Sequence, residues 1–218
     1  MKRPTLFLPP SASSGGSDGG VPNWFPSLFR TIVSQQLASA AADTIHAKCI
    51  KAYTSEKDGK ITADLVLNAK YAERKVKGEG EGLKQFVNGA RPGLSRSKRE
   101  YVQSLAEHFS DPERLKDVDL SDLSEEELSE RLTAVKGLGE WSVEMFKIFK
   151  LRRPDVFSVG DLAVRKGTAL LLGHKADKFE SSKGKKELKE LAEKFSPYRS
   201  LVCMLAYERW DQEKPKRK

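Results

Sequence analysis

Two short amphipathic segments are joined by Lys136-Gly137-Leu138-Gly139, and this arrangement restricts the fold more than any other feature of the chain. Residues 124–127 have the composition of a helix capping box, and apolar residues follow them at helical spacing. Helical spacing returns after the turn, over 143–149. Two glycines separated by one residue permit a turn that is too tight for residues with side chains. The sequence therefore predicts a helix–turn–helix hairpin over residues 128–150.

Helical spacing of apolar residues also dominates the rest of the chain. Further helices are predicted over 24–53 with a break at 34–36, over 62–70, from Ser95 to Phe109, from Leu162 to Leu172 with Asp161 as N-cap, and over 198–210 with Pro197 at the first helical position. No segment alternates apolar and polar residues over the length of a strand. We therefore expect an all-α fold.

The chain length permits one large domain or two small domains that share an interface. Its 218 residues are 38% hydrophobic, which is enough for a core. We expect a disordered lead-in over 1–22, a helical domain over 23–211 with insertions at 71–92 and 173–190, and a basic tail over 212–218. No apolar run approaches the roughly 18 residues of a transmembrane helix, and no signal peptide is evident, so we expect a soluble intracellular protein without membrane contact.

The charge balance favours an anionic partner. Lysine and arginine total 39 against 31 aspartate and glutamate, a net charge of +8, although a solvated charged surface explains the same excess. The two cysteines, Cys49 and Cys203, lie within apolar helical patterns and are expected to be buried thiols. Two cysteines cannot supply the four thiolates of an iron–sulfur cluster, and no zinc-ligand spacing occurs, so no metal or cofactor is expected.

The glycine turn is a candidate anion site. Glycines before a helix let backbone N–H groups approach a phosphate, and the helix dipole adds partial positive charge there. The same pattern is also compatible with a purely structural corner. The functional interpretation gains support because Asp161 and the pair Arg165-Lys166 follow within the same stretch, residues 132–167.

Five blocks of the sequence together resemble the helix–hairpin–helix DNA glycosylases. They occur in the family's order within residues 24–210, and the closest likeness is to the alkylpurine branch, the 3-methyladenine DNA glycosylases of the bacterial AlkA and yeast Mag type. The blocks are IVSQQLASAAA (32–42), GLSRSKREYVQSLA (93–106), VKGLGEWSVEMF (135–146), DVFSVGDLAVRKG (155–167) and FSPYRS (195–200). The resemblance implies two helical subdomains around a central cleft, without the N-terminal β-rich domain of the bacterial members.

The resemblance places the family's catalytic aspartate at Asp161. Cleavage of an N-glycosidic bond develops positive charge on the deoxyribose, and a carboxylate held in a pocket of low dielectric constant stabilises that charge. The alternative is that Asp161 only caps its helix, and both roles are compatible. An alkylated purine leaves as a neutral molecule, so a second carboxyl group is not required, and neither Glu140 nor Glu144 is assigned as a general acid.

The residue two places after the hairpin separates the branches of this family. The lyase-competent branch has a lysine there, whereas this chain has Trp141, so the resemblance implies a monofunctional enzyme that leaves an abasic site. Trp141 and Tyr207 match aromatic residues of the family's base pocket, and Met145 stands where the bacterial pattern has another aromatic. Aromatic rings attract a cationic base by about 0.5–2 kcal/mol, although ordinary core packing is the alternative for each ring.

The resemblance also implies contacts with double-stranded DNA that contains alkylated bases. Gln36, with Leu37 as second choice, is expected to fill the gap that a flipped base leaves, although simple solvent exposure also explains an amide at this bend. The other DNA-binding candidates surround the hairpin and the helix after Asp161; they are Lys136, Gly137, Leu138, Gly139, Ser142, Arg165 and Lys166. We expect a monomer, located in the nucleus if the source is eukaryotic and in the cytoplasm otherwise.

Two other functions remain open at this stage. One is a non-catalytic helix–hairpin–helix module that only binds the DNA backbone, which differs from the enzyme at Asp161. The other is a bifunctional glycosylase and lyase, which Trp141 and the shortage of cysteines disfavour. The basic tail fits a nuclear localisation patch or a solubilising end equally well.

Overall fold

The computed structural model describes residues 22–54, 59–74 and 84–213. These residues form two compact units, one ending at Gly139 and the other beginning at Glu140. The expected pair of helical subdomains is thereby confirmed, whereas the cleft between them stays a prediction. The lead-in, apart from Pro22, and residues 214–218 of the basic tail lie outside the described residues.

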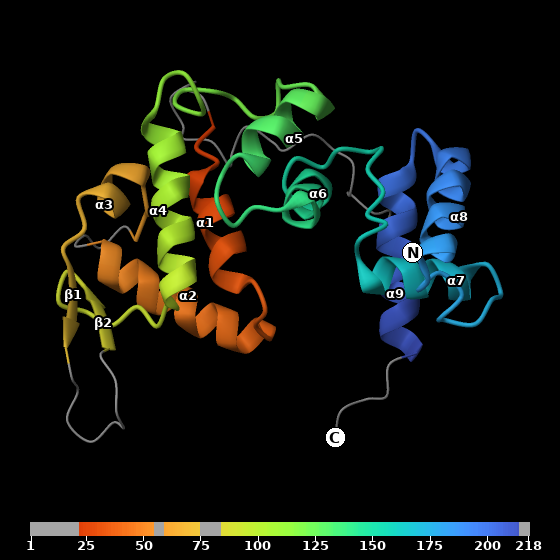
Figure 1. The fold of residues 1–218 in the computed structure, drawn as a ribbon, viewed down its shortest axis with the longest axis horizontal. Helices are drawn as coiled ribbons and strands as arrows, with labels where there is room; N and C mark the ends of the chain where they lie inside the picture. Colours follow the sequence, from red (N-terminus) through yellow and green to blue (C-terminus); the bar gives the residue numbers. More distant parts are fainter. Residues whose placement is uncertain (1–21, 55–58, 75–83, 214–218) are drawn as a thin grey trace. The chain divides into compact units, whose positions relative to one another are not determined.

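The N-terminal unit is built mainly from helices (Figure 1). Its elements are α1 (Phe25–Ser34), α2 (Ser39–Tyr53), α3 (Ala63–Leu67), β1 (Tyr71–Arg74), β2 (Lys84–Val87), α4 (Arg96–Ser110) and α5 (Glu125–Thr133). Helix α1 packs against α2 and α4, and α3 packs against α4. The buried side chains of α1 are Phe25, Leu28, Phe29, Ile32 and Val33, which recur at the spacing that predicted the helix. The predicted break after residue 34 is confirmed.

Side-chain caps begin two of these helices where the sequence predicts them. The hydroxyl of Ser95 accepts a hydrogen bond from the backbone N–H of Lys98 at the start of α4. At the start of α5, Ser124 and Glu127 form the predicted capping box, each side chain accepting from the backbone N–H of the other residue. Such a box satisfies N–H groups that have no partner within the helix. The first helix of the predicted hairpin is therefore confirmed.

A small sheet departs from the purely helical expectation. Strands β1 and β2 pair antiparallel, with Tyr71 opposite Val87 and Arg74 opposite Lys84. The sequence of this region has no periodicity, and the region was expected to be an insertion. Each strand has only four residues, which is too few to reveal alternation. All four residues of β1 are exposed, so its apolar and polar residues gave no indication of a strand. The fold class remains helical.

The C-terminal unit contains α6 (Glu140–Phe149), α7 (Leu162–Leu171), α8 (Ser182–Ala192), the short 3-10 helix η2 (Glu193–Phe195) and α9 (Arg199–Glu213). Helices α7 and α9 lie against each other. A Cβ atom on Gly167 would lie 1.9 Å from the carbonyl oxygen of Ala206, so only glycine permits this approach. The close contact places Asp161, which caps α7, and Tyr207, on α9, in the same part of the unit.

The sequence missed one helix of this unit and misplaced the start of another. No helix was predicted over α8, where Leu188 packs with Ala169 and Phe179 in a buried cluster. The assignment of residues 173–190 as an insertion stays a prediction. Pro197 is not at the first position of the last helix, because α9 begins at Arg199. The Asp155 carboxylate accepts hydrogen bonds from the backbone N–H of Arg199 at 3.3 Å and from its Nε at 2.7 Å, which fixes that start.

Cys49 and Cys203 are both buried free thiols, as predicted. Burial raises the pKa of each thiol to about 12, which keeps both protonated at neutral pH. Among the residues that the structure describes, no helix is long and apolar enough to cross a membrane.

Candidate active site

Asp161 is held by hydrogen bonds on both carboxylate oxygens. Oδ1 accepts from the backbone N–H of Val164 at 2.9 Å, which makes Asp161 the N-cap of α7 as predicted. Oδ2 accepts from Nε1 of Trp141 at 2.7 Å. The residue is 8% exposed. The carboxylate is therefore fixed in orientation and largely shielded from water, as an electrostatic catalyst requires.

Tyr207 completes the surroundings of this carboxylate. Burial is the main cause of the raised pKa of the Tyr207 phenol. The charge of Asp161 and a hydrogen bond between the two side chains raise this pKa further. The hydroxyl oxygen also lies 3.2 Å from Sδ of Met145. The structure thus brings together Asp161, Trp141, Met145 and Tyr207, the four residues that the sequence assigns to catalysis and the base pocket. Their roles in binding a base stay predictions.

Phe149 on α6 lies beside Tyr207, one of these aromatic residues, although from the sequence it was predicted only as part of a helix. Its ring centroid lies 5.9 Å from that of Tyr207. The side chain is 47% exposed, close to the 45% of Trp141. Residues 141, 145 and 149 are spaced four apart on α6, which places them along one face of the helix. This spacing in the sequence could have identified Phe149 as a third aromatic residue of the group formed by Trp141 and Tyr207.

Arg165 fixes the backbone that leads into Asp161. One guanidinium nitrogen donates to the carbonyl oxygens of Val159 at 2.9 Å and Gly160 at 2.7 Å. Arg165 is 8% exposed, and its Nε has no hydrogen-bond partner in the structure. These contacts argue against the predicted phosphate contact of Arg165, because a buried guanidinium bound to backbone oxygens is not available to DNA.

Two further candidates for DNA binding also have partners within the protein. Lys166 is half-buried, forms an ion pair with Glu180 at 3.1 Å, and lies 5.0 Å from the ring of Trp210. Ser142 is buried on α6. Their contacts with DNA stay predictions.

Glu144 lines a cavity of about 440 Å³ beside Trp141. Burial raises the pKa of this carboxyl group, against the opposing effect of a hydrogen bond from the Ser158 hydroxyl to Oε2 at 2.5 Å. Nearby Glu140 and Asp161 add smaller upward contributions to the pKa. No general-acid role is predicted for Glu144 from the sequence. Its raised pKa makes this carboxyl group easier to protonate than an exposed glutamate, and it lies in the same unit as Asp161.

The glycine turn lies in the N-terminal unit, directly before α6 begins. Gly137 has φ +92°, and a Cβ atom there would lie 2.2 Å from Cγ of Tyr101. Gly139 has no heavy atom within 4 Å of an added Cβ. Leu138 between them is buried, and Lys136 before them is exposed and pairs with Glu100 at 2.7 Å. Gly137 therefore serves the packing of the turn, whereas Gly139 leaves an open surface next to exposed backbone.

The bend between α1 and α2 separates the two adjacent glutamines. Gln35 donates its side-chain N–H to the carbonyl oxygen of Gly137 at 2.7 Å. Gln36 is exposed and has a left-handed backbone with φ +58°. Leu37 is partly buried. Gln36 is thus the more exposed amide of the two, and its entry into DNA stays a prediction.

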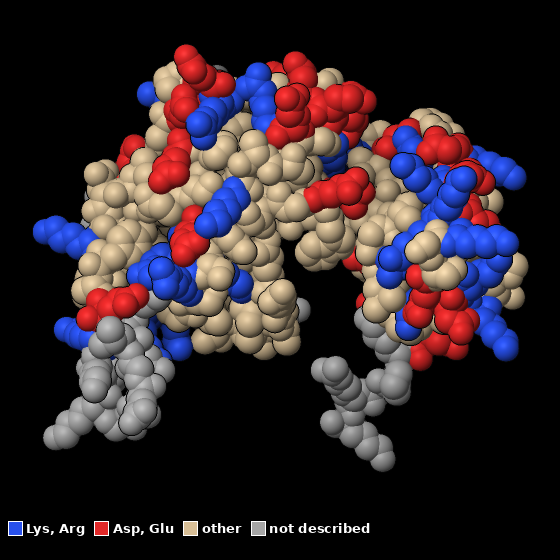
Figure 2. Space-filling model, viewed as in Figure 1, with Lys and Arg blue, Asp and Glu red and all other residues tan. Residues whose placement is uncertain are grey.

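Surface charge does not by itself define a DNA-binding face. In Figure 2, lysine and arginine side chains on the C-terminal unit are interspersed with acidic ones. Several basic residues of that unit are engaged in ion pairs, among them Lys178 with Glu187 and Arg209 with Glu213. The net positive charge is therefore a weak guide, and the exposed backbone of the turn is the more specific feature.

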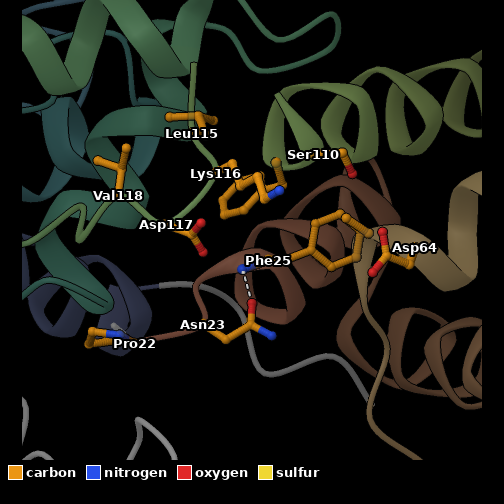
Figure 3. A pocket seen from close by; sticks show the side chains of 11 residues that line it. Pro22, Asn23, Phe25, Asp64, Ser110, Leu115, Lys116, Asp117 and Val118 are labelled. Carbon is orange, nitrogen blue, oxygen red and sulfur yellow. Dashed lines mark hydrogen bonds between the residues drawn. The ribbon is translucent and has the colours of Figure 1, made fainter. Parts of the chain in front are cut away.

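Another cavity, of about 380 Å³, lies in the N-terminal unit between Pro22 and Val118 (Figure 3). Its rim carries Asp64, Asp117 and Lys116, and Asn23 accepts a hydrogen bond from the backbone N–H of Phe25 at 3.1 Å. The lining includes none of the predicted site residues. Within the described residues, no group of three His, Cys, Asp or Glu side chains is arranged to hold a metal ion.

Comparison with known proteins identifies the family. Residues 29–197 match the model of the HhH-GPD superfamily base excision DNA repair proteins. The chain therefore belongs to the HhH-GPD superfamily. Within it, the chain is 32% identical over 218 aligned positions to the DNA-3-methyladenine glycosylase of Saccharomyces cerevisiae, covering 86% of this chain and 68% of that protein. The predicted resemblance to the alkylpurine branch is confirmed.

Other relatives agree with this placement. DNA-3-methyladenine glycosylase 1 of Schizosaccharomyces pombe is 32% identical over 149 residues, which are 66% of this chain and only 55% of that protein. The crystal structure of a DNA-3-methyladenine glycosidase from Bacillus halodurans superposes with a TM-score of 0.65 at 29% identity, covering 88% of this chain and 77% of that one. The S. pombe Mag1 structure, in complex with abasic DNA, has a TM-score of 0.60 at 24% identity, covers 93% of this chain and 87% of that one, and supports the fold.

Proposed function

We propose that this chain is a monofunctional DNA glycosylase that hydrolyses the N-glycosidic bond of alkylated purines, such as 3-methyladenine and 7-methylguanine, in double-stranded DNA. The observation that carries the proposal is the carboxylate of Asp161, oriented by Val164 and Trp141 and adjoining the aromatic group of Trp141 and Tyr207. The relatives from S. cerevisiae and S. pombe, both DNA-3-methyladenine glycosylases, support the same substrate class.

The chemistry follows from the charges involved. A purine nucleotide alkylated at N3 or N7 is cationic, and its base leaves as a neutral molecule when the bond to C1′ breaks and positive charge develops on the deoxyribose. The Asp161 carboxylate stabilises that developing charge. Water then adds to C1′ and loses a proton, which leaves an abasic site. The electron-rich rings of Trp141 and Tyr207 attract the cationic base by about 0.5–2 kcal/mol and hold its neutral parent less strongly. Trp141 stands where a lyase would have lysine, so no Schiff base forms.

DNA is the partner in this proposal. Backbone N–H groups of the turn around Gly139 bind phosphate, supported by the exposed Lys136, and Gln36 fills the stack after the damaged nucleotide is flipped. The enzyme acts as a monomer. In a eukaryotic cell its place is the nucleus, where its substrate is.

Base release from methylated DNA tests the proposal. Duplex DNA treated with a methylating agent is incubated with the native protein, and the released bases are separated by chromatography. We expect free 3-methyladenine or 7-methylguanine, with abasic sites in the DNA and no covalent complex after borohydride treatment. Binding without any released base would instead support the non-catalytic module, and a trapped covalent complex would support the lyase.

A further inference from the structure

The bend that carries Gln36 is attached to the glycine turn by its neighbour. Gln35 donates Nε2–H to the Gly137 carbonyl oxygen at 2.7 Å across 102 positions of sequence. Gly137 also packs closely against α4, because an added Cβ atom would lie 2.2 Å from Cγ of Tyr101. The amide of Gln35 therefore connects the bend between α1 and α2 to the glycine turn, two loops that are far apart in the sequence.

A lysine of α4 holds the same bend from a second side. Nζ of Lys98 donates to the carbonyl oxygens of Val33 at 2.6 Å and Gln35 at 2.7 Å. Carbonyl groups at the C-terminal end of a helix lack partners within the helix, and a cation there also interacts favourably with the helix dipole. Burial lowers the pKa of Lys98. The ammonium group of Lys98 is therefore partly desolvated at the C-terminal end of α1, where it bonds to these carbonyl oxygens.

Helix α4 is the common support of both loops. The hydroxyl of Ser104 accepts from the backbone N–H of Lys136 at 3.2 Å, and Glu100 pairs with the Lys136 side chain at 2.7 Å. Lys98, Tyr101 and Ser104 are spaced by three residues and share one face of α4. Gln36, which follows the anchored Gln35, is exposed and has a left-handed backbone conformation. The position of this residue is thus determined by its neighbours.

We propose that Gln35 and Lys98 are positioning residues that hold Gln36 at a fixed distance from the phosphate-binding turn. Gln36 then reaches the gap in the base stack while the turn is bound to the DNA backbone. The inference rests on the proposed function, since it assigns the two residues to base flipping. Neither residue touches the damaged nucleotide. Their effect on the reaction passes through Gln36.

Single-turnover excision of one alkylated purine, in duplex and in single-stranded DNA of the same sequence, tests this inference. Gln35→Met replaces the amide donor with an apolar side chain of nearly the same size. Its matched control is Gln103→Met, a half-buried glutamine of α4 whose hydrogen-bond partners are Tyr71 and Glu107. Lys98→Met is paired with Lys48→Met, a lysine exposed on α2. In duplex DNA we expect the rate to fall on the order of 10-fold for Gln35→Met and Lys98→Met, because small displacements of a positioning group are costly. In single-stranded DNA, which has no opposite stack to fill, we expect a change of less than about 2-fold.

A double mutant separates positioning from general destabilisation. In a Gln36→Ala background, Gln35→Met should add almost nothing, because its effect depends on the side chain already removed. Equal losses in duplex and single-stranded DNA, or losses that multiply in the double mutant, would overturn the proposal. Melting temperatures of all variants within about 3 °C of the native protein exclude unfolding as the cause.

A binding readout keeps this test separate from the proposed function. DNA containing a stable abasic analogue, with 2-aminopurine opposite it, reports filling of the stack by a change in fluorescence without any base release. The native protein and Gln103→Met should produce the change, whereas Gln35→Met and Gln36→Ala should not. If the native protein releases no base, the enzyme assignment fails, and the fluorescence result still decides the role of Gln35. A full fluorescence change with Gln35→Met would contradict that role.

Discussion

Trp141 donates its indole N–H to Asp161 at 2.7 Å, so the residue that offers an aromatic face also orients the carboxylate proposed for catalysis. The other oxygen of Asp161 is bound by the N-terminal turn of α7. Together the two hydrogen bonds leave the carboxylate little freedom to rotate. An aromatic residue and a helix cap thereby become parts of one electrostatic arrangement.

Trp141→Phe separates these two functions of the indole. Phenylalanine keeps an aromatic face but lacks the N–H donor. A hydrogen bond to a charged group contributes about 1.5–3 kcal/mol, so we expect the single-turnover rate of base release to fall about 10- to 100-fold. The affinity for duplex DNA, measured by fluorescence anisotropy, should change less than about 3-fold. An unchanged rate would show that stacking alone accounts for Trp141.

Arg165 and Lys136 should respond differently to removal of their charge. Arg165 is buried and bound to the carbonyl groups before Asp161, whereas Lys136 is exposed beside the turn. We expect Arg165→Met to reduce base release about 10-fold and leave the salt dependence of DNA affinity unchanged, since no phosphate contact is lost. Lys136→Met should weaken binding and lower the slope of log affinity against log salt by about 1. A reduced slope for Arg165→Met would restore the phosphate contact predicted from the sequence.

The helices were largely predictable because each shows local periodicity or a cap. Asp161, Ser95 and Ser124 were identifiable as caps, since capping depends on a few adjacent residues. Helix α8 was missed because lysines and glutamates cover most of it, and its buried positions make contacts with residues distant in sequence. Pro197 was misassigned because Asp155, more than forty positions away, determines where α9 begins.

The residues assigned to the site by resemblance lie together, but their interactions could not be deduced from sequence. Asp161 contacts both Trp141 and Tyr207 in the structure, and the roles of the three residues stay predictions. The role of Arg165 could not be deduced, because burial of a charged side chain depends on packing that a string of residues does not display. The same reason explains why Gln35, rather than Gln36, is the anchored member of the pair.

Gly137→Ala and Gly139→Ala form a matched pair within the turn. A methyl group at 137 would collide with the Tyr101 ring and occupy a position with φ +92°, whereas the site at 139 is open. We expect Gly137→Ala to lower stability by about 1–3 kcal/mol, which corresponds to a fall in melting temperature of about 3–10 °C. Gly139→Ala should leave the melting temperature unchanged and weaken DNA binding, because its methyl lies where a phosphate is expected to approach. Equal melting temperatures for the two variants would contradict this geometry.

Glu144 should make stability depend on pH. Burial raises its pKa in the folded state, so above the pKa of the unfolded chain the unfolded state loses its proton first. The contribution of Glu144 to stability is therefore fully present at acidic pH and is lost as pH rises through the folded-state pKa. Glu144→Gln removes this titration and keeps an acceptor for the Ser158 hydroxyl. We expect the variant to melt higher than the native protein at pH 8 and equally at pH 4; a lower melting temperature at pH 8 would show that the ionised carboxylate is stabilising.

In the proposed mechanism, base release depends on the negative charge of Asp161, and Asp161→Asn removes that charge. Asparagine is nearly the same size and is itself a good helix cap, so α7 and the melting temperature should be preserved. With the native protein as reference, single-turnover release of 3-methyladenine at saturating enzyme should fall by about 100-fold or more, while affinity for the same duplex stays within about 3-fold. Release by Asp161→Asn at the native rate would contradict the account.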